Sequence, residues 1–141
     1  FNEKKARPMG RAARGVKAIS LKKGDEVISM DSVIKGTTIL TATENGFGKR
    51  TKIDDYRITN RGGKGIITIK ITEKNGPVIG SLQVTEEDEI MLITNKGRIV
   101  RMKAKGISQM SRNTQGVRLL RLEEDEKAVA VTRLAETEDE E

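Results

Sequence analysis

Arg112-Asn-Thr-Gln115-Gly116-Val117-Arg-Leu-Leu120-Arg-Leu122 is one of three segments of the 141-residue sequence that align with one another without gaps. The other two are Arg11-Ala-Ala-Arg14-Gly15-Val16-Lys-Ala-Ile19-Ser-Leu21 and Arg61-Gly-Gly-Lys64-Gly65-Ile66-Ile-Thr-Ile69-Lys-Ile71. Their shared glycines are 50 and 51 residues apart along the chain. Self-similarity at a fixed period of this length indicates a repeat architecture.

Two further sets of segments keep the same period. Matching apolar stretches begin at Ile28, Ile79 and Val129, which are 51 and 50 residues apart. The pair Thr43-Glu-Asn45-Gly46 and Thr94-Asn-Lys96-Gly97 is displaced by 51 residues. Because three different motifs share one spacing, we interpret about 50 residues as one structural unit that recurs about three times.

Each repeat is predicted to form β-strands. Short aliphatic or β-branched segments with partial alternation are typical of strands, and they lie at 78–84, 90–94, 98–102 and 117–122. Asn45-Gly46 and Asn95-Lys96-Gly97 are signals for tight hairpins, since Asn and Gly tolerate positive φ. No segment has convincing helical periodicity. We therefore predict an all-β fold of propeller-like blades with about four strands each.

Three repeats are too few to close a propeller ring, which typically needs about four to eight blades. Residues 1–36 are expected to supply the late part of one repeat and the first strand of the next. The chain is therefore predicted to be a partial array with exposed sheet edges.

The composition argues against several classes of function. With no Cys and no His in the sequence, Cys/His zinc sites, Ser-His triads and histidine acid-base chemistry are excluded. The only aromatic residues are Phe1, Phe47 and Tyr56, so a surface that stacks unpaired bases is not expected. No apolar run is long enough to cross a membrane, and no signal peptide is visible, so a cytoplasmic location is expected.

The charge is divided unevenly along the chain. Residues 1–122 hold 25 Lys and Arg against 12 Asp and Glu, whereas residues 123–141 hold 2 against 9. A basic folded body is typical of phosphate binding, although it also serves solubility alone. The acidic end, 135–141, is expected to be a disordered tail that competes with phosphate for the basic surface.

The repeated segment has the composition of a phosphate-binding loop. An Arg precedes the glycine by four residues in each copy, and a basic or amide residue directly precedes the glycine at Arg14, Lys64 and Gln115. Such a loop offers backbone N–H groups and a guanidinium to one phosphate. The alternative is structural: the glycine relieves crowding between blades, and the arginine pairs with a carboxylate or caps a turn.

Three stretches resemble the blade signatures of the DNA gyrase A C-terminal domain. They are Phe47-Gly48-Lys49-Arg50-Thr51, Thr94-Asn95-Lys96-Gly97-Arg98 and Arg112-Asn113-Thr114-Gln115-Gly116-Val117. The resemblance implies a six-bladed β-pinwheel, in which neighbouring blades exchange strands, and places about its last three blades at residues 1–134. It also implies a basic perimeter that binds and bends double-stranded DNA, so that the holoenzyme introduces negative supercoils using ATP.

The family's gyrase box, Gln-Arg/Lys-Arg-Gly-Gly-Lys/Arg-Gly, has a similar loop in this chain. The box-like loop is Asn60-Arg61-Gly62-Gly63-Lys64-Gly65, and Thr59-Asn60 stands where the family has Gln and the first basic residue. That departure puts the essential role of the box in doubt here, while phosphate contact remains the prediction for the loop.

Further expectations follow from the resemblance. The predicted DNA-binding residues are Arg11, Arg14, Lys49, Arg50, Arg61, Lys64, Arg98, Arg101, Lys103, Lys105 and Arg112. The segment is expected to carry no catalytic residue, metal or cofactor, since ATP and Mg²⁺ are used elsewhere in this ATP-hydrolysing type IIA topoisomerase. Expected partners are the rest of the gyrase A subunit, together with the gyrase B subunit, in an A2B2 holoenzyme at the bacterial nucleoid in the cytoplasm.

Smaller features and two alternatives complete the prediction. Tyr56 is interpreted as a packing residue with a hydrated hydroxyl, and the runs Glu86–Glu89 and Glu123–Glu126 as solvated turns in preference to metal sites. The first alternative is a topoisomerase IV C-terminal domain, which would bind DNA with little wrapping. The second is a propeller scaffold that binds proteins, which the repeats predict but the charge does not.

Overall fold

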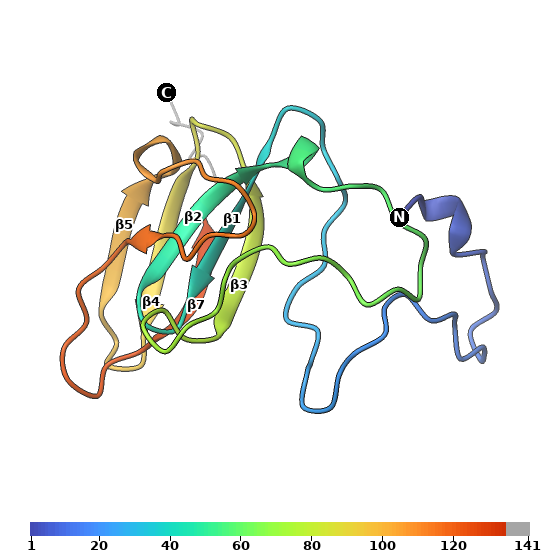
Figure 1. Cartoon of the computed structure of the whole chain (residues 1–141), viewed down its shortest axis with the longest axis horizontal. Helices are drawn as coiled ribbons and strands as arrows, with labels where there is room; N and C mark the ends of the chain where they lie inside the picture. The colour runs from blue at the N-terminus through green and yellow to red at the C-terminus, as the bar shows by residue number, and fades with distance from the viewer. Residues whose placement is uncertain (135–141) are drawn as a thin grey trace, which may run out of the picture.

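The computed structural model describes residues 1–134, and these contain short antiparallel strands and three single 3₁₀ turns but no α-helix (Figure 1). The elements are η1 (Glu3–Lys5), β1 (Thr38–Thr43), β2 (Phe47–Lys52), η2 (Ile53–Asp55), β3 (Val78–Val84), β4 (Glu89–Thr94), β5 (Ile99–Lys103), η3 (Ala104–Gly106), β6 (Val117–Arg118) and β7 (Ala128–Arg133). The all-β prediction is confirmed. The tail expected at 135–141 lies outside the described residues.

The strands form two sheets, each built around one hairpin. The first sheet has the order β3-β1-β2-β6, and the second has the order β5-β4-β7. Gly46 in the β1–β2 turn and Gly97 in the β4–β5 turn have φ of 83° and 78°, a conformation that disfavours residues with a Cβ. Both predicted hairpins are therefore confirmed, with the glycine where the turn needs it.

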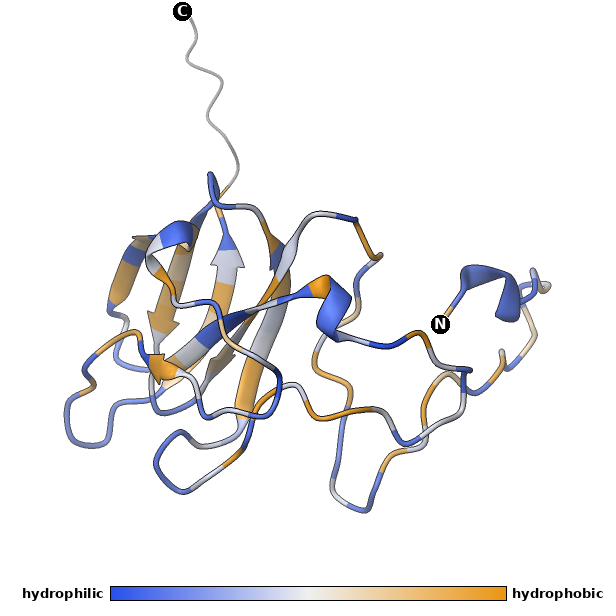
Figure 2. Cartoon of the chain, turned by 45° about the horizontal axis from the view of Figure 1, so that its top comes forward, coloured by the Kyte–Doolittle hydropathy of each residue, from blue (hydrophilic) through white to orange (hydrophobic). Residues whose placement is uncertain are grey.

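The hydrophobic core lies between the two sheets. Leu40 of β1 and Ile90 of β4 are fully buried in one cluster, although they belong to different sheets. A Cβ added to Gly80 of β3 would lie 2.6 Å from the Val131 side chain of β7, so the two outer strands pack in close contact. Apolar residues follow the strands of both sheets, and the long connecting loops carry apolar residues between polar ones (Figure 2). The two sheets correspond to consecutive repeats, as the 51-residue spacing of their hairpins predicts.

Strand β6 joins a sheet that begins almost 80 residues before it in the sequence. Its residues Val117 and Arg118 pair with Gly48 and Phe47 of β2. Gly116 directly precedes β6 with φ of 77°, and a Cβ there would lie 2.7 Å from the carbonyl oxygen of Gly48. The sequence predicted a strand over 117–122, but only 117–118 are paired as a strand, because β2 provides the partner for these residues alone.

Residues 1–36 and 53–77, which we call the extended arm, contain no strand. Most of them form the long loops on the right of Figure 1, beside the two sheets, whereas residues 73–77 return to the β1–β2 turn, where the Asn45 N–H donates to the carbonyl of Asn75 at 3.1 Å. The strand expected within 1–36 is therefore wrong, and the segment is instead held by a side chain of β3. The Ile34 N–H donates to Gln83 Oε1 at 2.7 Å, and Gln83 Nε2 donates to the carbonyl of Ser32.

The three 3₁₀ turns follow the repeat, although the sequence did not predict them. η1, η2 and η3 begin at residues 3, 53 and 104, at the same spacings as the repeated glycines. Within residues 1–134, no helix has the length and apolar character that crossing a membrane requires.

Candidate nucleic-acid interface

The three copies of the repeated segment lie beside one another in chain order. The Ser20 N–H donates to the carbonyl of Gly63 at 2.8 Å, and the Lys70 N–H donates to the carbonyl of Thr114 at 2.8 Å. The two donors are 50 residues apart and the two acceptors 51, so the same hydrogen bond is made twice. The second and third basic loops are therefore placed against the strand-like part of the copy before them.

The repeated arginines contact backbone carbonyls. Arg61 donates through Nε to the carbonyl of Lys5 at 3.0 Å and through Nη1 to the carbonyl of Lys17 at 3.3 Å. Arg112 donates through Nη1 to the carbonyl of Ile67 at 2.9 Å. Neither side chain forms an ion pair with a carboxylate of residues 1–134. The structural alternative for these arginines is therefore correct in part: they bind backbone carbonyls, and they do not pair with a carboxylate of the described residues.

Five other predicted cations are exposed and make no ion pair within the described chain: Arg11, Arg14, Lys64, Lys103 and Lys105. Arg11 and Arg14 belong to the first loop and Lys64 to the second, whereas Lys103 and Lys105 lie at the end of β5 and in η3. Exposed cations without an internal carboxylate partner keep their charge available for phosphate.

Lys49 and Arg50 do not lie on the surface, and their expected place on a rim is wrong. The side chain of Lys49 is fully buried in β2, where Nζ donates to the carbonyls of Ser111 (2.7 Å) and Arg112 and to Thr114 Oγ1 (3.0 Å). Burial, together with the nearby Arg112 charge, lowers the pKa of Lys49 to about 8. Lys49 therefore organises the third basic loop from beneath.

Arg50 is buried because its face of β2 is covered by the second sheet. Its Nε donates to the carbonyl of Ile107 at 2.8 Å, and its backbone N–H donates to the carbonyl of Ser108 at 3.0 Å. Lys49-Arg50 looked like a surface motif because the sequence gives no sign that later segments cover both faces of β2.

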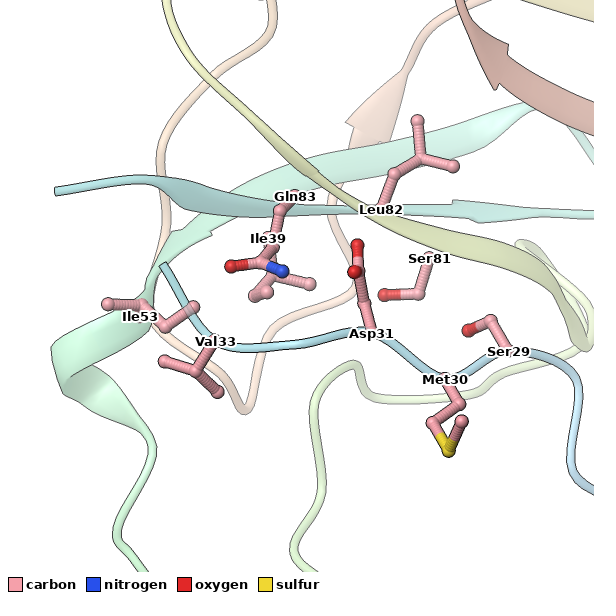
Figure 3. Close-up of a pocket in the computed structure, with 9 residues that line it drawn as sticks. All are labelled: Ser29, Met30, Asp31, Val33, Ile39, Ile53, Ser81, Leu82 and Gln83. Atoms are coloured by element: carbon pink, nitrogen blue, oxygen red, sulfur yellow. The ribbon is translucent and has the colours of Figure 1, made fainter. Parts of the chain in front are cut away.

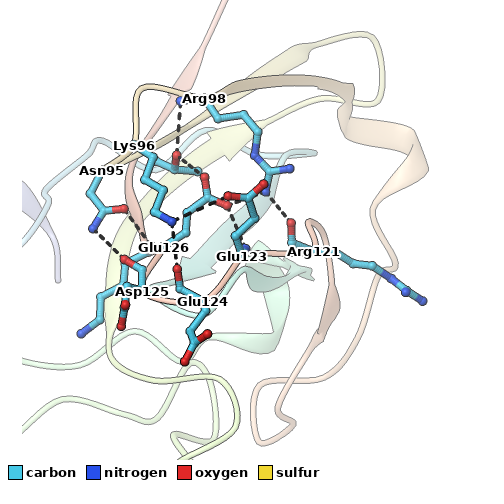
Figure 4. Close-up of polar contacts among 10 residues, drawn as sticks. Asn95, Lys96, Arg98, Arg121, Glu123, Glu124, Asp125 and Glu126 are labelled. Atoms are coloured by element: carbon cyan, nitrogen blue, oxygen red, sulfur yellow. Dashed lines mark hydrogen bonds and ion pairs between the residues drawn. The ribbon is translucent and has the colours of Figure 1, made fainter.

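Arg98 and Arg101 are paired with the protein's own carboxylates. Arg98 Nη2 lies 2.7 Å from Glu126 Oε1, and Arg101 Nη2 lies 2.5 Å from Glu89 Oε2. Figure 4 shows Arg98 and Glu126 within a network that joins the β4–β5 turn to residues 121–126. These two arginines offer phosphate less free charge than the loop cations do.

Glu126 is the buried member of that network. Its carboxylate accepts from the Glu123 N–H at 3.1 Å, from Thr94 Oγ1 at 2.8 Å and from Arg98. The hydrogen bond from the Glu123 backbone is the main cause that holds the pKa of Glu126 below its usual value. The run Glu123–Glu126 is a turn, as predicted, but its last residue is buried and structural.

The repeated glycines adopt one conformation in all three copies. Gly15, Gly65 and Gly116 have φ of 80°, 81° and 77°, so each turn requires a residue without a Cβ. A close backbone approach occurs only at Gly116, whose Cβ would contact Gly48; nothing lies within 4 Å of a Cβ at Gly15. The predicted turn is confirmed in each copy.

A small cavity and Tyr56 lie outside the loops and the ion-pair network of the described residues. A cavity of about 150 Å³ lies where residues 29–33 cross β1 and β3, and Asp31 is its only ionisable lining residue (Figure 3). The described residues contain no cluster of His, Cys, Asp or Glu that could hold a metal ion. Tyr56 is half-buried, and its hydroxyl is hydrogen-bonded to Thr68 Oγ1.

Four exposed cations of the repeated segments were not among the predicted residues: Lys17, Lys70, Arg118 and Arg121. Lys17 and Arg118 occupy one position of the repeat, and Lys70 and Arg121 occupy another, each 101 or 51 residues apart. Comparing charge at equivalent positions of the three copies would have found them. Arg118 also lies over the ring of Phe47, 5.4 Å from its centroid.

Comparison with known proteins gives one consistent family. The model of the DNA gyrase C-terminal domain, beta-propeller, matches residues 1–34, 37–85 and 88–135. The chain is 48% identical to the DNA gyrase A protein of Staphylococcus aureus strain MRSA252 and 47% identical to that of strain NCTC 8325. Both alignments cover the whole chain but only 16% of the relative's length.

Two solved structures are similar in fold. "Structure of DNA gyrase A C-terminal domain" has a TM-score of 0.87 at 29% identity and covers 96% of this chain and 46% of that one. "Crystal structure of the C-terminal domain of DNA topoisomerase IV" has a TM-score of 0.87 at 27% identity and covers 95% of this chain and 42% of that one. The sequence and fold together show that the chain belongs to the DNA gyrase C-terminal domain, beta-propeller family.

Proposed function

We propose that this chain is a non-catalytic module that binds double-stranded DNA through its basic loops and bends the duplex along them. In this proposal it serves the ATP-dependent negative supercoiling of a DNA gyrase, within an A2B2 holoenzyme in the bacterial cytoplasm. ATP and Mg²⁺ are bound elsewhere in that enzyme. The relatives that support the gyrase assignment are gyrase A proteins of which the chain spans 16%.

The observation that carries the proposal is the array of loops. Identical hydrogen bonds, Ser20 to Gly63 and Lys70 to Thr114, set consecutive copies of the basic segment side by side. The first two loops carry exposed cations without carboxylate partners in the described chain. Phosphates recur regularly along a duplex, so a regular series of cations fits its backbone and needs no base reading.

The magnitudes limit what a single loop can do. Bending a site of about 20 to 30 base pairs costs on the order of 1 to 6 kcal/mol, so several loops must act together to offset it. If about six phosphates are neutralised, the logarithm of the association constant should fall with the logarithm of salt concentration with a slope of roughly −5.

Duplex binding at several salt concentrations tests the proposal. We expect binding at low salt with that steep slope, and closer duplex ends in the complex, measured by energy transfer between end labels. Single-stranded DNA of equal length is the control, because only three aromatic side chains are available for stacking. No duplex binding at low salt would favour the protein-binding scaffold.

The topoisomerase IV C-terminal domain is the second candidate, since a structure with that title matches with the same TM-score as the gyrase domain. The reconstituted holoenzyme separates the two. Negative supercoiling of relaxed plasmid supports the gyrase assignment, and relaxation without supercoiling supports topoisomerase IV.

A further inference from the structure

We propose that the arginine four residues before each repeat glycine is a positioning residue that fastens one basic loop to the preceding copy. Arg61 and Arg112 do this within the chain. Phosphate contact then depends mainly on the cation directly before the glycine, Arg14 or Lys64. The fastening stands on hydrogen-bond geometry, whereas the assignment of Arg14 and Lys64 rests on the proposed function.

The two fastening contacts are equivalent by position. Arg61 donates to the carbonyl of Lys17 at 3.3 Å, and Arg112 donates to that of Ile67 at 2.9 Å. Lys17 and Ile67 are 50 residues apart, and both stand six residues after their own repeat arginine. The same contact is thus made twice. The acceptor is a lysine in one copy and an isoleucine in the other, which is possible because every residue offers a backbone carbonyl. A side chain that touched its neighbour by chance would not reproduce this register.

The backbone beside these arginines repeats as well. Next to Arg61, the Gly62 N–H donates to the carbonyl of Ala18 at 2.6 Å, and the Ser20 N–H donates to that of Gly63 at 2.8 Å. Next to Arg112, the Lys70 N–H donates to the carbonyl of Thr114 at 2.8 Å. Arg61 therefore lies beside two backbone hydrogen bonds between copies, and Arg112 lies beside the one of them that recurs.

Arg61 also donates a hydrogen bond through a second nitrogen of its guanidinium, Nε. Its Nε–H reaches the carbonyl of Lys5 at the end of η1, so one guanidinium bridges two separate segments of the arm. A planar guanidinium has several donors in fixed directions, whereas a lysine ammonium is a compact charge on a flexible stem. Lysine would keep the charge at this position and lose the bridge.

The residue directly before the glycine divides the loops into two kinds. Lys64 is exposed and free of ion pairs in the described chain, whereas Gln115 accepts a hydrogen bond from Thr72 Oγ1 at 3.3 Å. The third loop is also held from below by Lys49. The second loop is thus built to present charge, and the third mainly to anchor the series.

Amide hydrogen exchange of the free protein tests the fastening directly. Arg61→Lys should raise exchange at Ser20 and Gly62 several-fold, up to about tenfold, because a charge-assisted hydrogen bond that supports their backbone hydrogen bonds is lost. Arg112→Lys should raise exchange at Lys70 in the same way. Lys64→Gln is the matched control in the same loop and should leave these amides unchanged.

Duplex binding separates the two roles. Lys64→Gln should reduce the steepness of the salt dependence by about 0.9, the value for one lost phosphate contact. Arg61→Lys should weaken binding at fixed salt, since it moves the loop, without reducing the steepness. Unchanged exchange at Ser20 and Gly62 in Arg61→Lys, or an equal rise in Lys64→Gln, would overturn the inference. If the wild-type chain binds no duplex, the proposed function fails, and the exchange result still decides the fastening.

Discussion

Residues 61–71 and 112–122 have nearly the same pattern of arginine, glycine and aliphatic residues, yet they fold differently. The later segment enters a sheet as β6, because the edge of β2 lies beside Gly116 and accepts its strand. The earlier segment lies in the extended arm without a strand, and its backbone hydrogen bonds are made to Ala18 and Ser20 and, at Lys70, to Thr114. A β-strand needs a partner edge as well as a suitable sequence. The same motif can therefore serve as a strand in one copy and as a loop support in another.

The largest expected difference between the two regions is in stability. Leu40→Ala removes a fully buried side chain from the core between the sheets and should lower the free energy of unfolding by about 2 to 5 kcal/mol. Ile58→Ala is the control in the arm, where the side chain is 88% exposed, and should change it by no more than about 0.5 kcal/mol. Urea unfolding measures both, and equal losses would show that the arm contributes to the core.

The repeat glycines allow the stability of the arm and of the two-sheet region to be compared at equivalent positions. Gly116→Ala should cost about 1 to 2 kcal/mol for its left-handed backbone and a further 1 to 3 kcal/mol or so for the contact with Gly48. Gly15→Ala carries only the backbone cost, since nothing lies within 4 Å of its Cβ. Thermal unfolding of the two variants checks this, and a Gly15 variant as unstable as the Gly116 variant would contradict the comparison.

Lys49 makes the third loop different from the other two. Lys49→Met keeps an unbranched side chain, one atom shorter, and leaves the carbonyls of Ser111 and Arg112 without its ammonium, at a cost of about 1 to 3 kcal/mol. Because the arm loops have no such contact, amide exchange should rise around residues 111–118 and stay unchanged around 61–65. A uniform rise over both loops would argue against a local role for Lys49.

The parts of the fold that were predictable are those fixed by local chemistry. Asn45-Gly46 and the glycine after Lys96 indicated both hairpins, because positive φ at a tight turn limits the residue type. The strand at 78–84 was found from its aliphatic run, and its bounds match β3. The repeat period also predicted the correct number of units, since it needs no knowledge of contacts.

The parts that were missed depend on which residues meet across the repeats. Lys49 and Arg50 looked like surface cations because the sequence does not show what covers each face of a strand. Residues 111–114 bury Lys49, and the segment at Ile107 buries Arg50. The missing strand in residues 1–36 has the same cause, since no local signal says whether a hairpin lies beside it. Arg61 and Arg112 were recognised as repeated residues, but their carbonyl acceptors come from another copy.

The smallest effect at neutral pH is expected at the turns that end the repeated segments. The turn 72–75 is closed by the buried amide of Asn75, and the equivalent turn 123–126 is closed by the buried carboxylate of Glu126. Of these two closing groups, only the carboxylate of Glu126 can titrate. The pKa of Glu126 is lower in the folded chain than in the unfolded chain, so the unfolded chain takes up the proton first as pH falls. The stabilisation by this carboxylate is therefore complete above its ordinary pKa and is lost as pH falls through the lowered one.

Glu126→Gln isolates that contribution. The amide keeps the shape of the side chain but cannot titrate, so the loss of stability between neutral pH and about pH 3 should be smaller than in the wild type. Denaturant midpoints at a series of pH values measure the difference, and Asn75→Asp places a titratable group in the arm as the matched change. If Glu126→Gln kept the full acid sensitivity, the pairing of Glu126 with Arg98 and the Glu123 N–H could not be its source. The contrast between the two turns would then need another carboxylate of the two-sheet region, and the other ion-paired ones among the described residues are Glu44, Asp88, Glu89 and Glu123.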